Sequence, residues 1–251
     1  MDIPNLIKEF VRTYRSGNHT KTDWEEPLIA FASAYDPLFL KLKTVISKTH
    51  SLPTELLKDA ETVISYFVPF KKEVVLSNVK GKNCSEEWAI AYVETNKLIA
   101  DLNEFLSKEL EKHDFKSVIL PPTHNFDQSN LISDWSHKHI AFIAGLGNFG
   151  IHQMLITERG CCGRLGSLVT NAEIPPTKRP QKEFCLYKHD NTCRKCVDNC
   201  IFNALKIDFF DRYKCYEVCL SNADLYSQFG LADVCGKCVC VVPCSFINPV
   251  K

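Results

Sequence analysis

The fold of this chain is decided by two cysteine-rich segments, FCLYKHDNTCRKCVDNC at residues 184–200 and VCGKCVCVVPC at residues 234–244. Ten of the 13 cysteines lie between Cys185 and Cys244. Cys193 and Cys196 are separated by two residues, so one tight turn can bring both thiolates to the same cluster, whereas Cys200 follows only after three residues. In two-cluster ferredoxins the cysteine after such a step ligates the other cluster. The spacing therefore predicts two neighbouring [4Fe–4S] clusters.

This crossed pattern divides eight cysteines between the two clusters. The predicted ligands are Cys185, Cys193, Cys196 and Cys244 for one cluster, and Cys200, Cys215, Cys235 and Cys238 for the other. Cys219 is a rival of Cys215, and Cys240 is a rival of Cys244. A pair of structural zinc sites is the alternative, but zinc commonly takes two C-x2-C pairs per site, which leaves the three-residue step after Cys196 unexplained. Cys161 and Cys162 lie in a glycine-flanked turn that is either simply packed or redox-active.

Composition excludes several classes of protein. Lys and Arg together number 30 and Asp and Glu also number 30, so the net charge is zero, which argues against a large nucleic-acid-binding surface. The N-terminus shows no signal-peptide pattern, and no apolar run is long enough to span a membrane. Thirteen cysteines in such a chain indicate metal ligands before disulfides. We expect a cytoplasmic protein, with an anaerobe as its natural source.

The remainder of the chain predicts a mixed α+β fold. Apolar spacings of three and four predict helices, and β-branched and aromatic runs predict strands. The expected helices are 4–16, 24–45, 85–112 and 136–145, and the expected strands are 62–69 and 116–120. The apolar runs 152–157 and 165–170 are expected to form a hairpin across the Gly160–Gly163 turn. Pro175, Pro176 and Pro180 mark a linker, so we expect one domain over residues 1–180 and a cysteine-rich domain over residues 181–251.

One segment before the cysteines carries a family resemblance. HIAFIAGLGNFGIHQMLITERGCCGRLGSLVTN, residues 139–171, resembles the central segment of epoxyqueuosine reductases, and LKDAETVISYFVPF, residues 57–70, is similar to their early strand. The resemblance extends over about residues 57–249 and marks a short, divergent member without the C-terminal helical-repeat domain. It implies a nitroreductase-like, cobalamin-binding α/β sandwich followed by a ferredoxin-like domain with two [4Fe–4S] clusters. Reductive dehalogenases share this arrangement.

The resemblance also assigns residues around a corrin. The residues expected to lie against cobalamin are Gly145, Leu146, Gly147, Asn148, Phe149 and Gly150. Arg164 is a candidate for binding cofactor phosphate or propionate groups, although it can also be an ordinary solvated charge. The general-acid aspartate of the family lies near Asp134, so the proton-donor candidates are Asp134, His137 and His139. A helix-capping role for Asp134 and buried hydrogen bonds for the histidines are the alternatives.

These observations predict a cobalamin-binding iron–sulfur reductase that passes electrons to a corrinoid cobalt and reduces a small-molecule or corrinoid substrate. The alternative is an electron-transfer protein that reductively activates a partner's corrinoid without substrate chemistry of its own. Flavin in the N-terminal pocket is a third hypothesis. An external donor such as ferredoxin or flavodoxin is expected to supply the electrons. A role on tRNA is not expected, because the helical-repeat domain and a basic excess are both missing from the sequence.

Overall fold

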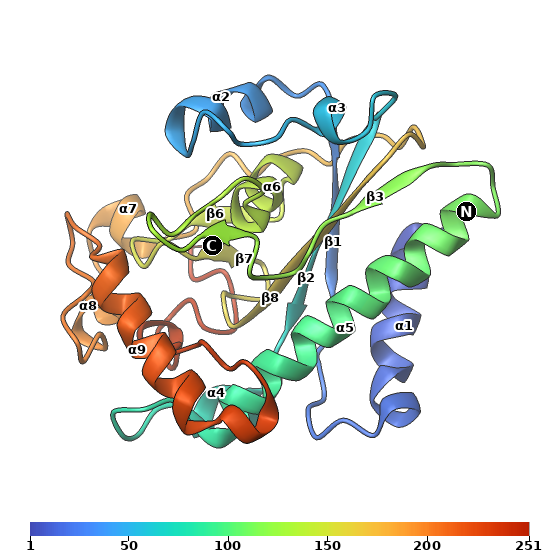
Figure 1. The fold of residues 1–251 in the computed structure, drawn as a ribbon. Helices are drawn as coiled ribbons and strands as arrows, with labels where there is room; N and C mark the ends of the chain where they lie inside the picture. The colour runs from blue at the N-terminus through green and yellow to red at the C-terminus, as the bar shows by residue number, and fades with distance from the viewer. Residues whose placement is uncertain (251) are drawn as a thin grey trace.

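The structure is a computed structural model that describes residues 1–250, and its centre is a four-stranded antiparallel sheet (Figure 1). The strand order is β1 (Leu28–Ser33), β2 (Thr62–Pro69), β8 (Gly163–Thr170) and β3 (Ser117–Ile119). Each strand pairs antiparallel with its neighbour. The β2 strand is buried along its whole length. Its alternate side chains enter two different cores, Tyr66 on one face and Phe67 on the other, which explains why its sequence is apolar at nearly every position.

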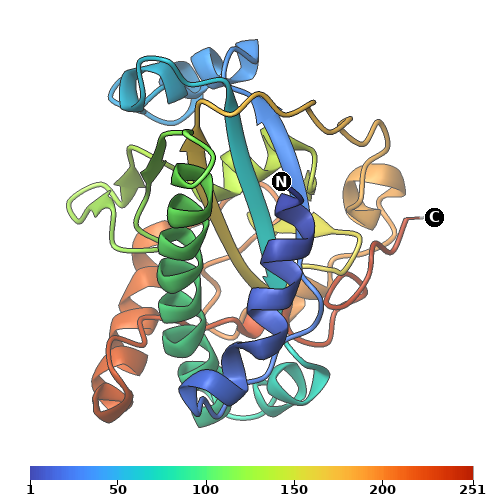
Figure 2. The same ribbon diagram turned by 90° about the vertical axis from the view of Figure 1, so that its right-hand side faces the viewer.

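Helices cover both faces of this sheet. Helices α1 (Ile3–Asn18) and α5 (Glu86–Glu111) pack side by side on one face (Figure 2). Helix α6 (His137–Ala144) packs on the other face, with α2 (Pro37–Val45) against it. The Ser85 hydroxyl accepts a hydrogen bond from the Trp88 N–H and so caps α5. The remaining N-terminal elements are short: α3 (Pro53–Leu56), α4 (Lys72–Ser77), the hairpin of β4 (Phe126–Asp127) with β5 (Ile132–Ser133), and the hairpin of β6 (Gly147–Phe149) with β7 (Leu155–Thr157).

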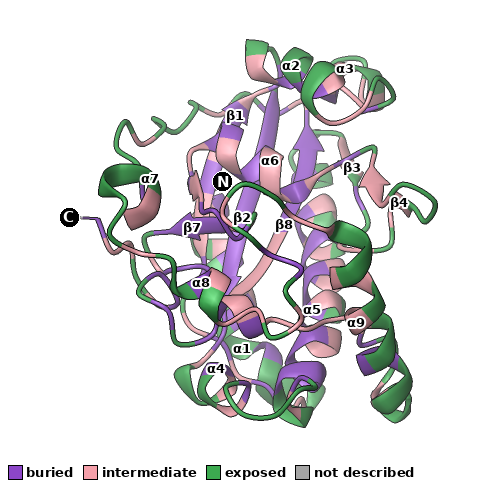
Figure 3. Ribbon diagram, turned by 90° about the vertical axis from the view of Figure 1, so that its left-hand side faces the viewer, coloured by how far each residue is buried: buried purple, intermediate pink, exposed green. Residues whose placement is uncertain are grey.

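The cysteine-rich region forms short helices joined by loops. They are α7 (Leu186–Asp190), α8 (Lys195–Asp198), α9 (Arg212–Leu225) and the 3₁₀ turns η1 (Ser227–Phe229) and η2 (Lys237–Val239). Its buried residues, such as Leu205 and Val239, join the same core as Trp88 of α5. Figure 3 shows this region lying across one end of the buried sheet. The division into two domains at residue 180 stays a prediction. Among residues 1–250, no helix is both long enough and apolar enough to cross a membrane.

Several predicted elements are confirmed. Helices 4–16, 85–112 and 136–145 correspond to α1, α5 and α6, and strands 62–69 and 116–120 correspond to β2 and β3. The α6 helix ends at Gly145, whose φ of 92° is the left-handed conformation that favours glycine at this position.

Two predictions are wrong. Residues 24–45 do not form one helix, because residues 28–33 form β1 and only 37–45 are helical. Ala30 and Ala32 occupy alternate positions of β1 and face the core. Alanine favours helices, so this alternation did not indicate a strand in the sequence. The runs 152–157 and 165–170 do not pair with each other either. The first ends in β7, which pairs with β6, and the second lies in β8, between β2 and β3.

Candidate functional site

The structure gathers the cysteines into two neighbouring groups of free thiols. The first cysteine site lines a cavity of about 20 Å³ and contains Cys185, Cys193, Cys196 and Cys244. The second cysteine site lines a cavity of about 250 Å³ and contains Cys200, Cys215, Cys219, Cys235 and Cys238. Cys196 and Cys200 lie in different groups, as the crossed spacing requires. The assignment of individual ligands stays a prediction, and Cys219 accompanies Cys215 as a fifth thiol at the second site.

The first cysteine site is closed by a backbone contact between two distant segments. Cys161 and Cys162 donate N–H hydrogen bonds to the carbonyl oxygens of Cys244 and Ser245, at 3.0 and 3.3 Å. Gly160 permits this approach, because a Cβ atom there would lie only 2.3 Å from the Ser245 oxygen. The turn that precedes β8 therefore fixes the position of Cys244 next to the other three thiols.

The second cysteine site depends on one glycine turn and one helix. Cys215 and Cys219 lie one turn apart on α9, so both face the same way. Cys235 and Cys238 flank Gly236, whose φ is 73° and whose Cβ position would be 2.4 Å from the Trp88 ring. Only glycine combines this backbone conformation with such close packing, so the turn rests directly on α5.

The donor set fits iron–sulfur clusters better than single zinc ions. A tetrahedral zinc holds its sulfur ligands about 3.8 Å apart, given a Zn–S bond of about 2.3 Å. Within residues 1–250, the group with ligand atoms all within 4.8 Å of one another is His152, Cys161 and Cys244, which contains one thiol of the first cysteine site and none of the second. The Trp88 Nε1 atom at the second site is buried and has no hydrogen-bond partner among residues 1–250. A cluster sulfide or thiolate would satisfy this donor.

A positive charge also accompanies the second site. Lys237 lies between Cys235 and Cys238 and is 5% exposed. Its ammonium group donates to the carbonyl oxygens of Asn78 at 3.0 Å and Lys80 at 2.6 Å. A buried cation at this place stabilises a negatively charged group among the thiols.

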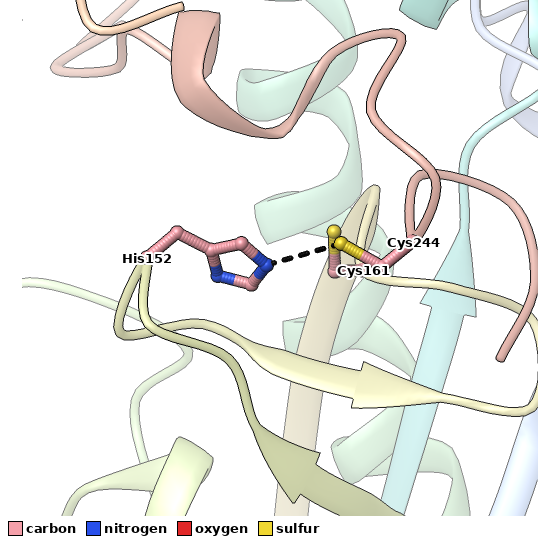
Figure 4. A group of neighbouring side chains, drawn as sticks. All are labelled: His152, Cys161 and Cys244. Carbon is pink, nitrogen blue, oxygen red and sulfur yellow. Dashed lines mark hydrogen bonds between the residues drawn. The ribbon is translucent and has the colours of Figure 1, made fainter. Parts of the chain in front are cut away.

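His152 and Cys161 both lie close to Cys244, and the His152 ring is directed at the Cys244 sulfur (Figure 4). The His152 Nε2 atom lies 3.4 Å from the Cys244 Sγ atom. Burial lowers the pKa of His152 to about 4, so the imidazole is neutral near pH 7. The Cys162 thiol and burial raise the pKa of Cys161, which keeps Cys161 a thiol. His152 lines the cavities of both cysteine sites, and Cys161 lines that of the second, so both side chains lie at the boundary between the two sites.

A third cavity, called the adjacent cavity below, lies beside the cysteines. It has a volume of about 270 Å³ and is walled by α6, β8 and the loop before α6. It shares Met154, Cys161, Gly163 and Arg164 with the cavity of the second cysteine site. Small-molecule sites usually measure about 300–1,000 Å³. The adjacent cavity therefore fits a small organic group, whereas a whole corrin with its side chains is larger than this space.

Four polar side chains meet where the two cavities join. The Tyr92 hydroxyl donates to the Asp233 Oδ1 atom at 2.7 Å, and the His124 Nε2 atom lies 3.5 Å from the same oxygen. The Arg164 guanidinium lies 4.3 Å from the centre of the Tyr92 ring. The Arg164 Nε atom is buried, and no hydrogen-bond partner for it lies in the described part of the chain. Burial raises the pKa of Tyr92 and keeps the hydroxyl protonated. The Tyr92 hydroxyl is thus a candidate proton donor, and it lies beside the positive charge of Arg164. Together these side chains form a suitable site for an anionic group.

The predicted proton donors are placed differently. Asp134 lies in an exposed loop, where its carboxylate accepts a hydrogen bond from the Thr49 hydroxyl, and it lines neither cavity. The His139 ring lies 4.8 Å from the Phe149 ring, with Nδ1 2.8 Å from the Ser136 hydroxyl, and it also lines neither cavity. Of the three candidates, His137 alone lines the adjacent cavity.

Both nitrogen atoms of His137 are already hydrogen-bonded. Its Nε2–H donates to the Pro121 carbonyl at 2.8 Å, and its Nδ1 accepts from the Ser167 hydroxyl at 2.8 Å. Burial lowers the pKa of His137 to about 4. This arrangement favours a structural role for His137. Tyr92 of α5 and Asp233 of the cysteine-rich region, which are not among the predicted site residues, are better placed to donate or accept a proton.

The glycine segment has packing reasons of its own. A Cβ atom at Gly147 would lie 1.9 Å from the Ile156 oxygen, so glycine permits the pairing of β6 with β7. A Cβ atom at Gly150 would lie 2.7 Å from the His152 ring. No residue of Gly145–Gly150 lines either of the two larger cavities near the cysteines. Contact of this segment with a corrin stays a prediction.

Solved structures show the same fold. A structure of epoxyqueuosine reductase from Bacillus subtilis is 17% identical, with a TM-score of 0.56, and the match covers 97% of this chain and 66% of that one. An epoxyqueuosine reductase bound to a tRNA stem loop matches with 18% identity, a TM-score of 0.57 and the same coverages. A reductive dehalogenase described as B12-dependent matches with 15% identity and a TM-score of 0.56 over 92% of this chain and 31% of its own.

The likeness concerns the fold. This chain spans 66% of the Bacillus enzyme and about a third of the dehalogenase. No family model and no curated protein matches the sequence. The expected epoxyqueuosine reductase-like fold is confirmed.

Proposed function

We propose that this chain is an iron–sulfur oxidoreductase that passes single electrons from two [4Fe–4S] clusters to an acceptor in or over the adjacent cavity. The observation that carries the proposal is the arrangement of the thiols. Two groups of cysteines lie side by side, and Cys161 lies against Cys244 of the first group while lining both the second group's cavity and the adjacent cavity. Electrons from the first cluster would therefore reach the acceptor over a short path.

The chain's own residues supply binding and protons at the acceptor. The Arg164 guanidinium, whose Nε atom has no hydrogen-bond partner within residues 1–250, would pair with an anionic group and hold it beside Tyr92. The Tyr92 hydroxyl would deliver a proton as the acceptor is reduced, and Arg164 would stabilise the resulting phenolate. Asp233 and His124, which meet at the cavity junction, would orient the hydroxyl and exchange its proton.

The acceptor proposed from the family resemblance is a corrinoid. Arg164 fits the acidic side chains or phosphate of such a cofactor, but the adjacent cavity is smaller than a corrin. This volume favours the second candidate function, in which the chain reduces a corrinoid held by a partner protein, with only part of that group entering the cavity. A tRNA substrate, as seen bound to one structural neighbour, is not proposed.

An anaerobic binding experiment tests both candidates. The protein would be reconstituted with iron and sulfide, its iron counted, and hydroxocobalamin added before gel filtration and electron paramagnetic resonance. About eight irons per chain, as two four-iron clusters contain, with a retained cob(II)alamin signal would support the corrinoid reductase. The same iron count without retained corrinoid would favour the electron-transfer function. Zinc in place of iron would refute the proposal.

The fifth thiol at the second site offers a matched pair of variants. Cys215→Ser and Cys219→Ser change neighbouring thiols on the same face of α9. If Cys215 is the ligand, its variant loses about half the iron while Cys219→Ser retains it. The opposite result would exchange their roles and leave the proposed function intact.

A further inference from the structure

The hydrogen bonds of His152 determine which of its nitrogen atoms carries the proton. The Met154 backbone N–H donates to the Nδ1 atom of His152 at 3.1 Å. An imidazole nitrogen that accepts a hydrogen bond carries no proton of its own, so the proton is on Nε2. That nitrogen lies 3.4 Å from the Cys244 Sγ atom. The imidazole is therefore a hydrogen-bond donor to Cys244.

The surrounding chain holds the ring in this orientation. His152 is 4% exposed and lies in the tight turn between β6 and β7. Gly150 donates its N–H to the Met154 oxygen at 3.0 Å across this turn. A Cβ atom at Gly150 would meet both the Cε1 and Nε2 atoms of the ring at 2.7 Å, so the ring edge is packed against a residue without a side chain. The same ring lines the small cavity of the first cysteine site.

We propose that His152 sets the reduction potential of the cluster at the first cysteine site by donating its Nε2–H to the Cys244 sulfur. This inference rests on the proposed function, since it requires a cluster bound through Cys244. A hydrogen bond to a ligand sulfur stabilises the reduced cluster more than the oxidised one, because reduction adds negative charge to the sulfurs. His152 thereby makes the first cluster easier to reduce than it would be without the donor. At the second cysteine site the Leu205 backbone N–H donates to the Cys200 Sγ atom at 3.3 Å. His152 also lines the larger cavity of that site, but within residues 1–250 the sulfur within hydrogen-bond distance of its Nε2 atom is that of Cys244.

Two substitutions distinguish the effect of losing the Nε2–H donor from the effect of losing the imidazole ring. His152→Asn keeps an acceptor near the Nδ1 position for the Met154 N–H but removes the Nε2–H. His152→Gln places an amide N–H near the Nε2 position. The exposed His189, which lies four residues after Cys185, gives the control variant His189→Asn.

Potentiometric titration followed by electron paramagnetic resonance would measure both midpoint potentials in each variant. We expect His152→Asn to lower one midpoint potential. At a fixed potential the ratio of reduced to oxidised cluster should fall about tenfold, which corresponds to a shift in that midpoint of about 59 mV for a one-electron couple. His152→Gln should restore most of this shift, and His189→Asn should change neither midpoint. Unchanged midpoints in His152→Asn, equal shifts at both clusters, or equal effects of Asn and Gln would each overturn the inference.

A measurement on the unsubstituted protein tests the inference even if the variants fail to bind their clusters. Electron–nuclear double resonance of the reduced protein labelled with ¹⁵N-histidine should show one nitrogen coupled to a cluster, and an exchangeable proton lost in ²H₂O. A cluster signal without this coupling would overturn the role of His152. If the unsubstituted protein contained no four-iron clusters, the proposed function itself would fail.

Discussion

Replacing Gly236 by alanine should damage the second cysteine site through two separate effects. The backbone effect comes from a φ of 73°, which costs a residue with a side chain about 1–2 kcal/mol. The packing effect comes from the new methyl group, which would lie 2.4 Å from the Trp88 ring and cost about 1–3 kcal/mol. Together they lower the free energy of unfolding by about 2–5 kcal/mol, a large share of the 5–15 kcal/mol typical of a folded protein.

Gly81 provides a matched control for this prediction. It has nearly the same φ, 76°, but nothing lies within 4 Å of its Cβ position, so Gly81→Ala should show only the backbone effect. Anaerobic urea unfolding should place the midpoint of Gly236→Ala about 0.5–1.5 M below that of Gly81→Ala, for a slope of about 2 kcal/mol per M. Gly236→Ala should also lose about half of the bound iron. Equal midpoints and equal iron in the two variants would refute the idea that Trp88 fixes the Cys235–Cys238 turn.

Three further variants test the remaining assignments. His137 has a folded-state pKa of about 4 against a usual value of about 6.5, so the unfolded chain binds its proton first and stability falls as the pH falls through this window. Between pH 7 and pH 5, the free energy of unfolding should therefore fall by up to about 2 kcal/mol less in His137→Gln than in the unsubstituted protein, measured by urea unfolding. The same pH dependence of stability in both proteins would contradict this expectation. Tyr92→Phe leaves the buried Asp233 carboxylate without its donor, so unfolding should become about 1–3 kcal/mol easier. Tyr92→Phe should also lower the rate constant of acceptor reduction more than it lowers the affinity for the acceptor. A larger effect on affinity than on the rate constant would exclude Tyr92 as the proton donor. Asp134→Asn should leave iron content and acceptor reduction unchanged and shift stability by less than about 0.5 kcal/mol, because Asp134 lies outside both cavities; a loss of activity would restore it as a catalytic candidate.

The sequence predicts features that depend on local spacing. The thiols of Cys193 and Cys196 are brought together by a single turn, and Gly145 ends α6 through a backbone conformation that favours glycine. The continuous apolar run of β2 likewise reflects burial on both sides of one strand. Each of these signals lies within about ten residues of chain, where composition and spacing are informative.

Features that depend on distant segments could not be predicted in the same way. The pairing of β8 with β2 joins residues about a hundred positions apart, and no local pattern distinguishes it from a hairpin with the preceding run. Tyr92 has the spacing of a core residue and is indeed buried, yet its hydroxyl reaches Asp233 from the cysteine-rich region. The role of such a residue becomes visible only when the two segments are placed together.

The backbone contact of Cys161 and Cys162 with Cys244 and Ser245 has a consequence for maturation and for damage by oxygen. The same contact closes the first cysteine site and forms part of the cavity wall. On the proposed function, iron bound through Cys244 would strengthen this contact and stabilise the wall of the adjacent cavity at the same time, since metal binding contributes directly to folding. Oxidative loss of that iron would weaken the wall of the adjacent cavity and would also remove an electron carrier. If the proposed function holds, exposure to air should therefore abolish acceptor binding and acceptor reduction together, without a form that binds its acceptor normally but reduces it slowly.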